Sequence, residues 1–257
     1  MTTLTPAAAR RAAGRATRVR TQAWFELGSI VRNGEQLMVT LLLPALLLVV
    51  LSVSDVVTLD TGGRARIDHV TPGVLALAVM SAALTSQAIS TSFDRRNGVL
   101  RLMATTPLGP GGLLAGKAVA LLCVEAVQVT VLGAVAAVLG WRPDPAGLAL
   151  ALVVLVLGTM AFTALAMLVA GTLRFEAVLA LANILLVLLA VGGGVVVPAD
   201  SLPDALAAVA RLLPSGALGE GLRGALHDGA VAWRDVAVLL GWSGALGWAT
   251  VRTFRWS

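Results

Sequence analysis

Long apolar stretches alternate with short polar ones along most of this sequence. Six stretches approach or exceed the roughly 20 residues that an α-helix needs to cross the hydrocarbon layer of a membrane. They occupy about residues 36–54, 72–93, 113–140, 147–173, 178–198 and 233–251. The pattern therefore predicts an all-α membrane protein with six transmembrane helices.

A different pattern precedes the first stretch. Trp24, Leu27 and Val31 recur at helical spacing, with arginines on either side of them. This spacing predicts an amphipathic helix that lies at the membrane interface. Residues 1–35 are thus expected to form a basic arm and an interfacial helix, and residues 36–257 a single transmembrane domain. The alternative is a basic tail in which the apolar residues are incidental.

Two connections are expected to contain short helices. Within residues 94–112, Val99, Leu102 and Met103 lie at helical spacing, and Pro107 ends the pattern, which predicts an amphipathic helix on the cytoplasmic face. Residues 199–232 alternate apolar helical stripes with proline and glycine, and they are too polar to span. We expect short re-entrant helices in the outer leaflet there, where protein or water satisfies the broken backbone.

Composition agrees with a membrane protein. Hydrophobic residues make up 58% of the 257 positions and charged residues only 13%, whereas soluble domains carry about 25% charged residues. The net charge of +5 would suggest nucleic acid in a soluble protein. Here the basic residues adjoin apolar spans, so anionic lipid is the expected partner and nucleic acid is not.

The distribution of lysine and arginine orients the spans. With six spans, both termini lie on one side of the membrane. We expect a bacterial cell membrane with both termini in the cytoplasm. The inner face then receives Arg10, Arg11, Arg15, Arg18, Arg20, Arg32, Arg95, Arg96, Arg101, Lys117, Arg174, Arg252 and Arg255. The outer face receives Arg64, Arg66, Arg142, Arg211, Arg223 and Arg234. This excess on the inner side is what the positive-inside rule requires.

The segment "GGLLAGKA", Gly111 to Ala118, fits a phosphate-binding loop in all but its last position. A working loop needs a preceding buried strand and a hydroxyl for the magnesium ion, but here a proline-broken loop precedes it and Ala118 takes the hydroxyl position. We therefore expect no nucleotide, cofactor or metal on this chain. Lys117 is expected to extend its ammonium toward the inner interface.

Polar residues within the predicted spans are candidates for a substrate path. Glu125 and Gln128 share one face of the third span, and Gln87 and Asn183 lie nearer the inner ends of theirs. A charged acid at the centre of a bilayer is costly, so Glu125 should face the bundle interior. It either binds a cationic or hydrogen-bonding substrate or a proton, or is a neutral acid bonded to Gln128 or a neighbouring helix. Gln87 and Asn183 have the alternative of helix-packing hydrogen bonds.

Other reactive side chains carry no chemistry in this reading. His69 and His227 are far apart in sequence and are expected to be solvated in outer loops. Cys123 lies inside an apolar run and is expected to be a small core residue. No nucleophile and base pair up, which excludes a hydrolase.

The segment "NGVLRLMATTPLGPGGLLAGK" resembles the inner loop of ABC-2 type transporter permeases. In that family, a Gly-x-Leu turn of a coupling helix precedes a Thr-Pro-Leu break and a Gly-Lys start to the third span. The residues that match are Gly98, Leu100, Thr106, Pro107, Leu108, Gly116 and Lys117. The later "LLPSGALGEGLRGAL" is similar to the segment before the family's last span. The family often has glutamate just ahead of the glycine turn, where this chain has Arg96 and Asn97.

The resemblance implies a permease half without enzymatic activity of its own. It would pair with a second permease copy or paralogue and with two separate ABC ATPase subunits, which bind ATP and magnesium, and it would export a substrate. Loop 94–106 would couple the two parts. The implied coupling residues are Asp94, Arg95, Arg96, Gly98, Leu100, Arg101, Leu102, Met103 and Pro107.

Two other functions remain open at this point. One is a membrane scaffold that anchors partners without transport, and the other is an intramembrane enzyme that uses Glu125, for which no second catalytic group is found. Tyrosine is absent and aromatic residues make up 4% of the chain, which disfavours a sugar-stacking path. The expected cargo is a small amphipathic molecule such as a drug, an antibiotic or a lipid.

Overall fold

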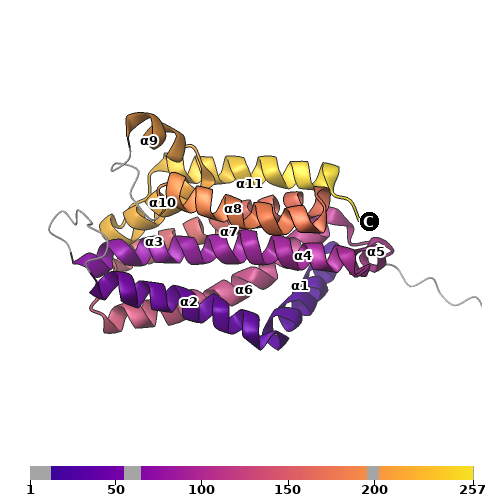
Figure 1. The fold of residues 1–257 in the computed structure, drawn as a ribbon, viewed down its shortest axis with the longest axis horizontal. Helices are drawn as coiled ribbons and strands as arrows, with labels where there is room; N and C mark the ends of the chain where they lie inside the picture. Colours follow the sequence, from indigo (N-terminus) through magenta and orange to yellow (C-terminus); the bar gives the residue numbers. More distant parts are fainter. Residues whose placement is uncertain (1–12, 55–64, 196–202, 257) are drawn as a thin grey trace, which may run out of the picture.

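The computed structural model describes residues 13–54, 65–195 and 203–256, and the regular elements in these ranges are all helices (Figure 1). In chain order they are α1 (Arg15–Arg32), α2 (Gly34–Val53), α3 (Arg66–Met80), the π-helix η1 (Ser81–Ser86), α4 (Gln87–Arg96), α5 (Val99–Ala104), α6 (Gly109–Val138), the 3₁₀ turn η2 (Pro145–Gly147), α7 (Leu148–Thr172), α8 (Phe175–Gly192), α9 (Asp204–Ala210), α10 (Pro214–Asp228) and α11 (Trp233–Thr253). The all-α prediction is confirmed.

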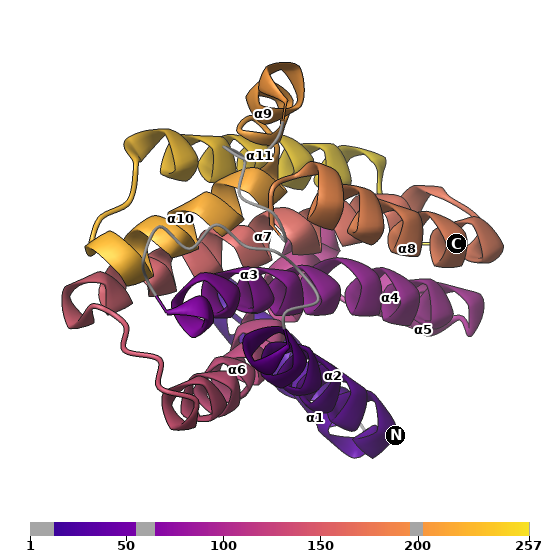
Figure 2. The same cartoon turned by 60° about the vertical axis from the view of Figure 1, so that its left-hand side comes forward.

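The long helices run lengthwise through one bundle with two distinct ends (Figures 1 and 2). The short helix α5 marks one end, which we call the α5 end, and α9 and α10 lie toward the other, the α10 end. The guanidinium of Arg18 in α1 donates to the carbonyl of Pro107, and Phe254 packs beside the buried Leu100 of α5. Both ends of the described chain therefore lie at the α5 end.

Within the described ranges, four helical segments are long and apolar enough to cross a membrane: Arg66–Arg96, Gly109–Val138, Pro145–Thr172 and Phe175–Gly192. The pair Arg15–Arg32 and Leu37–Val53, bent by 71°, makes a fifth if it is counted as one span. These helices confirm a multi-pass membrane protein. The sixth predicted span stays a prediction, because α11 is helical but carries Arg234 and Asp235 in its first turn and Arg252 in its last.

Several predicted boundaries move. The second predicted span begins at Arg66 rather than 72, so most of the connection expected between the first two spans, residues 55–71, either is helix or lies outside the described residues. The third begins at Gly109, because Pro110 in the first turn is compatible with a helix start. The fifth ends at Gly192, and the last residues of the predicted stretch are not described.

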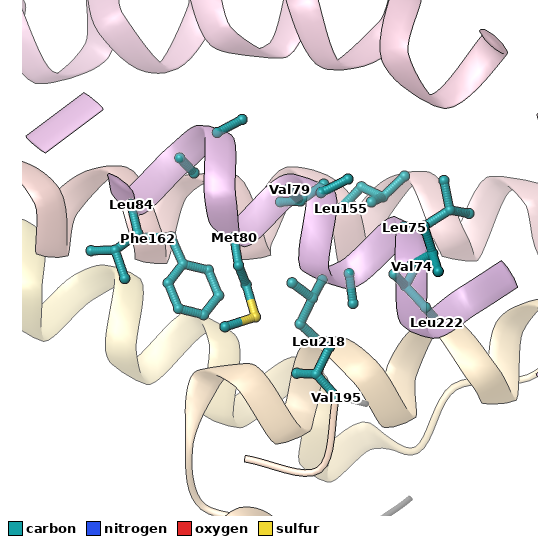
Figure 3. Close-up of a cluster of buried hydrophobic side chains, with 14 of the residues drawn as sticks. Val74, Leu75, Val79, Met80, Leu84, Leu155, Phe162, Val195, Leu218 and Leu222 are labelled. Atoms are coloured by element: carbon teal, nitrogen blue, oxygen red, sulfur yellow. The ribbon is translucent and has the colours of Figure 1, made fainter. Parts of the chain in front are cut away.

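The core lies where α3, α7 and α10 meet (Figure 3). Met80 and Phe162 are fully buried, and Leu218 and Leu222 of α10 pack into the same cluster. The predicted short helices of residues 199–232 are present as α9 and α10, and nearly every residue of α10 is buried between α3, α7 and α11. Whether they enter the outer leaflet stays a prediction.

Large apolar side chains also cover outward faces of the bundle. On α2 and α8 they form continuous exposed surfaces, which a soluble monomer rarely tolerates. These surfaces consist of Met38, Val39, Leu42, Leu43 and Leu46 on α2, and of Ile184, Val187, Leu188 and Val191 on α8. Lipid is the environment in which such faces are stable.

Candidate functional site

Lys117 of α6 is fully buried and lies between two carboxylates from other helices. Its Nζ is 2.9 Å from Oε2 of Glu26 in α1 and 3.4 Å from Oδ2 of Asp94 in α4. We call these three residues the charge cluster. A cation without water is tolerated only with such partners, because burial of an unpaired charge costs several kcal/mol or more. The charge cluster therefore fixes three helices relative to one another.

Gln22 extends the charge cluster toward α5. Its Nε2 donates to Oε1 of Glu26 at 2.8 Å and lies 3.9 Å from the sulfur of Met103. Gly116, the neighbour of Lys117, makes this approach of α1 possible. A Cβ at Gly116 would come within 2.6 Å of Cγ of Gln22, which is closer than atoms can pack.

These contacts explain the segment that imitates a phosphate-binding loop. Residues 109–138 form one continuous helix, so the glycine and lysine of the motif serve helix packing and an ion pair. The expectation that Lys117 extends toward the interface was wrong, because two acidic residues far away in sequence approach it inside the protein.

The predicted coupling segment divides at Gly98. This residue has a φ of 77°, in the left-handed region where glycine is favoured, and α5 begins directly after it. Asp94, Arg95 and Arg96 belong to the end of α4 instead of to the short helix. The short helix predicted between residue 94 and Pro107 therefore covers only Val99–Ala104, because the left-handed turn at Gly98 separates it from α4.

Helix α5 is anchored by one side and exposed on the other. Leu100 is fully buried against Leu113 and Met167, with Met103 partly buried beside it. Leu102, which the helical spacing grouped with Val99 and Met103, is 73% exposed. Arg101 is exposed next to it. The surface that α5 offers to a partner thus consists of Arg101, Leu102 and their neighbours.

Two of the predicted coupling arginines contact the junction between α7 and α8. Arg95 donates to the carbonyls of Ala170, at 2.8 Å, and Leu173. The guanidinium of Arg96 lies 4.8 Å from the ring centre of Phe175, a cation–π contact. Arg95 therefore ties α4 to the carboxyl end of α7.

The four predicted path residues separate into two groups. Glu125, Gln128 and Gln87 are at least 96% buried, and each has a side-chain oxygen without a hydrogen-bond partner among the described residues. Glu125 accepts from the hydroxyl of Thr159 in α7, and Gln128 donates to the carbonyl of Thr40 in α2 at 2.7 Å.

Asn183 does not join this group. It is exposed on α8 and donates to the carbonyl of Leu179 in its own helix at 2.8 Å. A role for Asn183 in a substrate path stays a prediction.

Gln87 lines a cleft of about 780 Å³ between α1 and α2 on one side and η1, α4 and α6 on the other. Glu26 and Asp94 of the charge cluster line the same cleft, and so does Thr40. We call it the α2–α4 cleft. Its size is in the range of ligand-binding cavities.

The two histidines and the cysteine are not where the sequence predicted. The rings of His69 in α3 and His227 in α10 lie with their centres 5.3 Å apart and their planes tilted by 44°. Nε2 of His227 lies 2.6 Å from the carbonyl oxygen of Asp68, so the histidines are neither isolated nor in loops. Packing of α10 against α3 brings them together. Cys123 is exposed on the outside of α6 and is not a core residue.

No metal site is found among the described residues, since no three histidine, cysteine, aspartate or glutamate side chains gather there in a suitable arrangement.

A bundle of apolar helices with a short exposed helix after a left-handed glycine is the arrangement that the sequence resemblance implied. Comparison with protein families decides the matter, because the sequence profile of the ABC-2 type transporter family matches residues 17–227. The chain belongs to the ABC-2 type transporter family. The matched region includes all but the first two residues of α1 and contains the whole charge cluster.

A distant relative is also found among proteins of known name. The Bacillus subtilis (strain 168) protein named "Putative transport permease YvfS" is 22% identical over 178 residues, which cover 69% of this chain and 73% of the relative. Both findings support a permease-type membrane subunit.

Sequence reasoning missed Glu26 and Gln22. Both lie on the helix face opposite Trp24, which is 77% exposed. The predicted helix was expected only to lie at the membrane interface. Its two polar residues four positions apart could have indicated a buried polar contact.

Proposed function

We propose that this chain is the transmembrane permease subunit of an ATP-driven exporter for a small amphipathic molecule. ATP and magnesium are bound by two separate ABC ATPase subunits, and a second permease copy or paralogue completes the path. The α5 end faces the cytoplasm of a bacterial cell. Membership of the ABC-2 family and the cluster of arginines at the α5 end support this assignment.

One observation carries the proposal. One side of α5 is exposed, while Leu100 on its other side is buried in the bundle and holds the helix in place. Leu102 and Arg101 thus offer an apolar side chain and a cation on a firm support. Such a pairing is typical of an anchor residue with a charged rim at a protein interface.

Contacts around α5 provide routes for a displacement to reach the spans. Met103 contacts Gln22, which bonds Glu26 and through it Lys117 of α6. Arg95 connects the α4 end of the same loop with α7. A partner that moves α5 would therefore act on α1, α6 and α7. Coupling requires that these contacts differ between two states of the transporter.

The test is retention of the ATPase. The tagged chain is purified gently from its native membrane, co-purifying proteins are identified by mass spectrometry, and ATP hydrolysis is measured. Arg101→Glu is the test variant, and Arg252→Glu is its matched control, because Arg252 is an exposed arginine at the same end but on α11.

We expect an ATPase with the parent chain and the control, and its loss with Arg101→Glu. Purification without any ATPase from all three would overturn the proposal and favour a membrane scaffold. Equal retention by all three would show that α5 is not the docking site.

A further inference from the structure

We propose that the α2–α4 cleft binds a cationic amphipathic small molecule. The inference deepens the proposed function, on which the description of this ligand as a substrate rests. Binding itself can be measured on the permease alone.

The charge of the cleft wall is the first argument. All charged side chains among the described residues that line it are acidic: Glu26, Glu35 and Asp94. The cation that pairs with two of them, Lys117, is fully buried behind the wall and contributes one positive charge. Negative charge is therefore left over at the surface of a partly desolvated cleft, where it attracts cations more strongly than in open water.

The second argument is an unused polar group. Gln87 is 4% exposed, lines the cleft, and has a side-chain oxygen that no described residue bonds. A buried acceptor without a partner costs about 1–3 kcal/mol, so most are satisfied in native proteins. Once the amide rotates toward the cleft, an ammonium or an N–H group of a ligand there would supply the missing donor.

The shape and lining of the cleft fit the rest of such a molecule. Apolar side chains make up much of the wall: Ile30, Val39, Ile89, Phe93, Leu121 and Val124. Inter-helix contacts of α6 bound the cleft on two levels, Lys117 with Glu26 and Gln128 with the carbonyl of Thr40. Lys117 and Gln128 are about 16 Å apart along α6 at the helical rise per residue. An apolar body of drug size fits between them.

The position of the cleft suits uptake from the inner side. Phe93 and Asp94 lie in the last turn of α4, at the α5 end, and Phe93 and Val39 are 45% and 57% exposed at its rim. With the α5 end in the cytoplasm, a cation concentrated at anionic headgroups would reach the cleft without crossing the membrane.

Rhodamine 6G, a cationic dye, and fluorescein, an anionic dye with a related ring system, are suitable probes. The full-length chain is placed in phosphatidylcholine nanodiscs without ATPase, and dye binding is followed by fluorescence anisotropy. Gln87→Leu removes the amide, and Glu35→Gln with Asp94→Asn removes two charges. Glu176→Gln is the control, since Glu176 is an exposed acid on α8 that does not line the cleft.

We expect saturable binding of rhodamine 6G and none of fluorescein. The double charge variant should raise the dissociation constant of rhodamine 6G about tenfold or more, and Gln87→Leu should raise it severalfold. Glu176→Gln should leave it unchanged. Because Glu35 is exposed, Glu35→Gln alone is a variant that cannot act by unfolding the bundle, and it too should weaken binding.

Equal binding by all variants, or binding of both dyes alike, would overturn the inference. So would the absence of saturable binding. Dye binding by a chain that retains no ATPase would support ligand binding in the cleft but contradict the exporter function. ATPase retention without dye binding would support the exporter function but contradict ligand binding in the cleft.

Discussion

The ammonium of Lys117 lies 2.9 Å from a carboxylate oxygen of Glu26, although 91 positions separate the two residues in the sequence. One belongs to a long apolar helix and the other to the helix that precedes the first predicted span. Helix α1 is therefore held to the bundle by charge and hydrogen bonds on its inner face, while Trp24 and Phe25 face outward. A contact of this kind gives α1 a fixed place beside α5.

Removal of Lys117 should destabilise the protein strongly. Lys117→Met leaves the buried Glu26 and the partly exposed Asp94 without their cation, for which a loss of about 3–5 kcal/mol is expected. Thermal unfolding of the purified chain measures it. The double variant Lys117→Met with Glu26→Leu should lose less than the sum of the two single variants, because the two residues interact. Additive losses would show that the ion pair contributes nothing.

A side chain at Gly116 should push α1 away from α6. Gly116→Val places atoms where Cγ of Gln22 lies and should cost about 1–3 kcal/mol by overpacking. Gly133→Ala on the same helix is the control, because a Cβ there meets only Trp141 at an ordinary 3.9 Å. The thermal unfolding midpoints of both variants test this. A midpoint for Gly116→Val as high as that for Gly133→Ala would show that α1 and α6 do not pack closely at Gly116.

Leu100 and Leu102 should have opposite effects although they lie on one short helix. Leu100→Ala opens a cavity against Leu113 and Met167 and should cost about 2–5 kcal/mol. Leu102→Ala, at an exposed site, should change stability by no more than about 0.5 kcal/mol yet weaken ATPase retention. Unchanged ATPase retention by Leu102→Ala would remove this residue from the docking surface.

Gly98 should tolerate asparagine better than alanine. A left-handed backbone costs residues with a Cβ about 1–2 kcal/mol, and asparagine least among them. Gly98→Ala should therefore tilt or loosen α5 and lower ATP hydrolysis of the assembled transporter, while Gly98→Asn should retain most of it. Equal activity of both would mean that the turn at Gly98 does not set the position of α5.

Much of the fold was accessible from the sequence, because period and length of apolar runs are local properties. The runs near residues 113–140 and 147–173 predicted α6 and α7 within a few residues, and the arginine-flanked apolar residues around Trp24 predicted α1. Helix ends were harder. They depend on single residues such as Gly98, whose left-handed turn separated Asp94 from the helix that follows.

The site was only partly predictable for a different reason. Sequence spacing places residues on a face of their own helix, but the partner depends on how helices pack. Glu125 was assigned to the interior correctly, while its contact proved to be Thr159, 34 positions away. Lys117 was misplaced because an ammonium near a helix end usually reaches solvent, unless acids from two other helices surround it, as they do here.

The π-helical turn between α3 and α4 has a consequence for chain length. A π turn accommodates one more residue than an α turn of similar rise, so the stretch Ser81–Ser86 stores a single surplus position within the longest span. Deletion of one residue there would leave a regular α-helix with Asp94 still pointing toward Lys117. The segment beyond it keeps its rotational phase with respect to the bundle, whereas a deletion between Gln87 and Phe93 would turn Asp94 by about 100° away from Lys117.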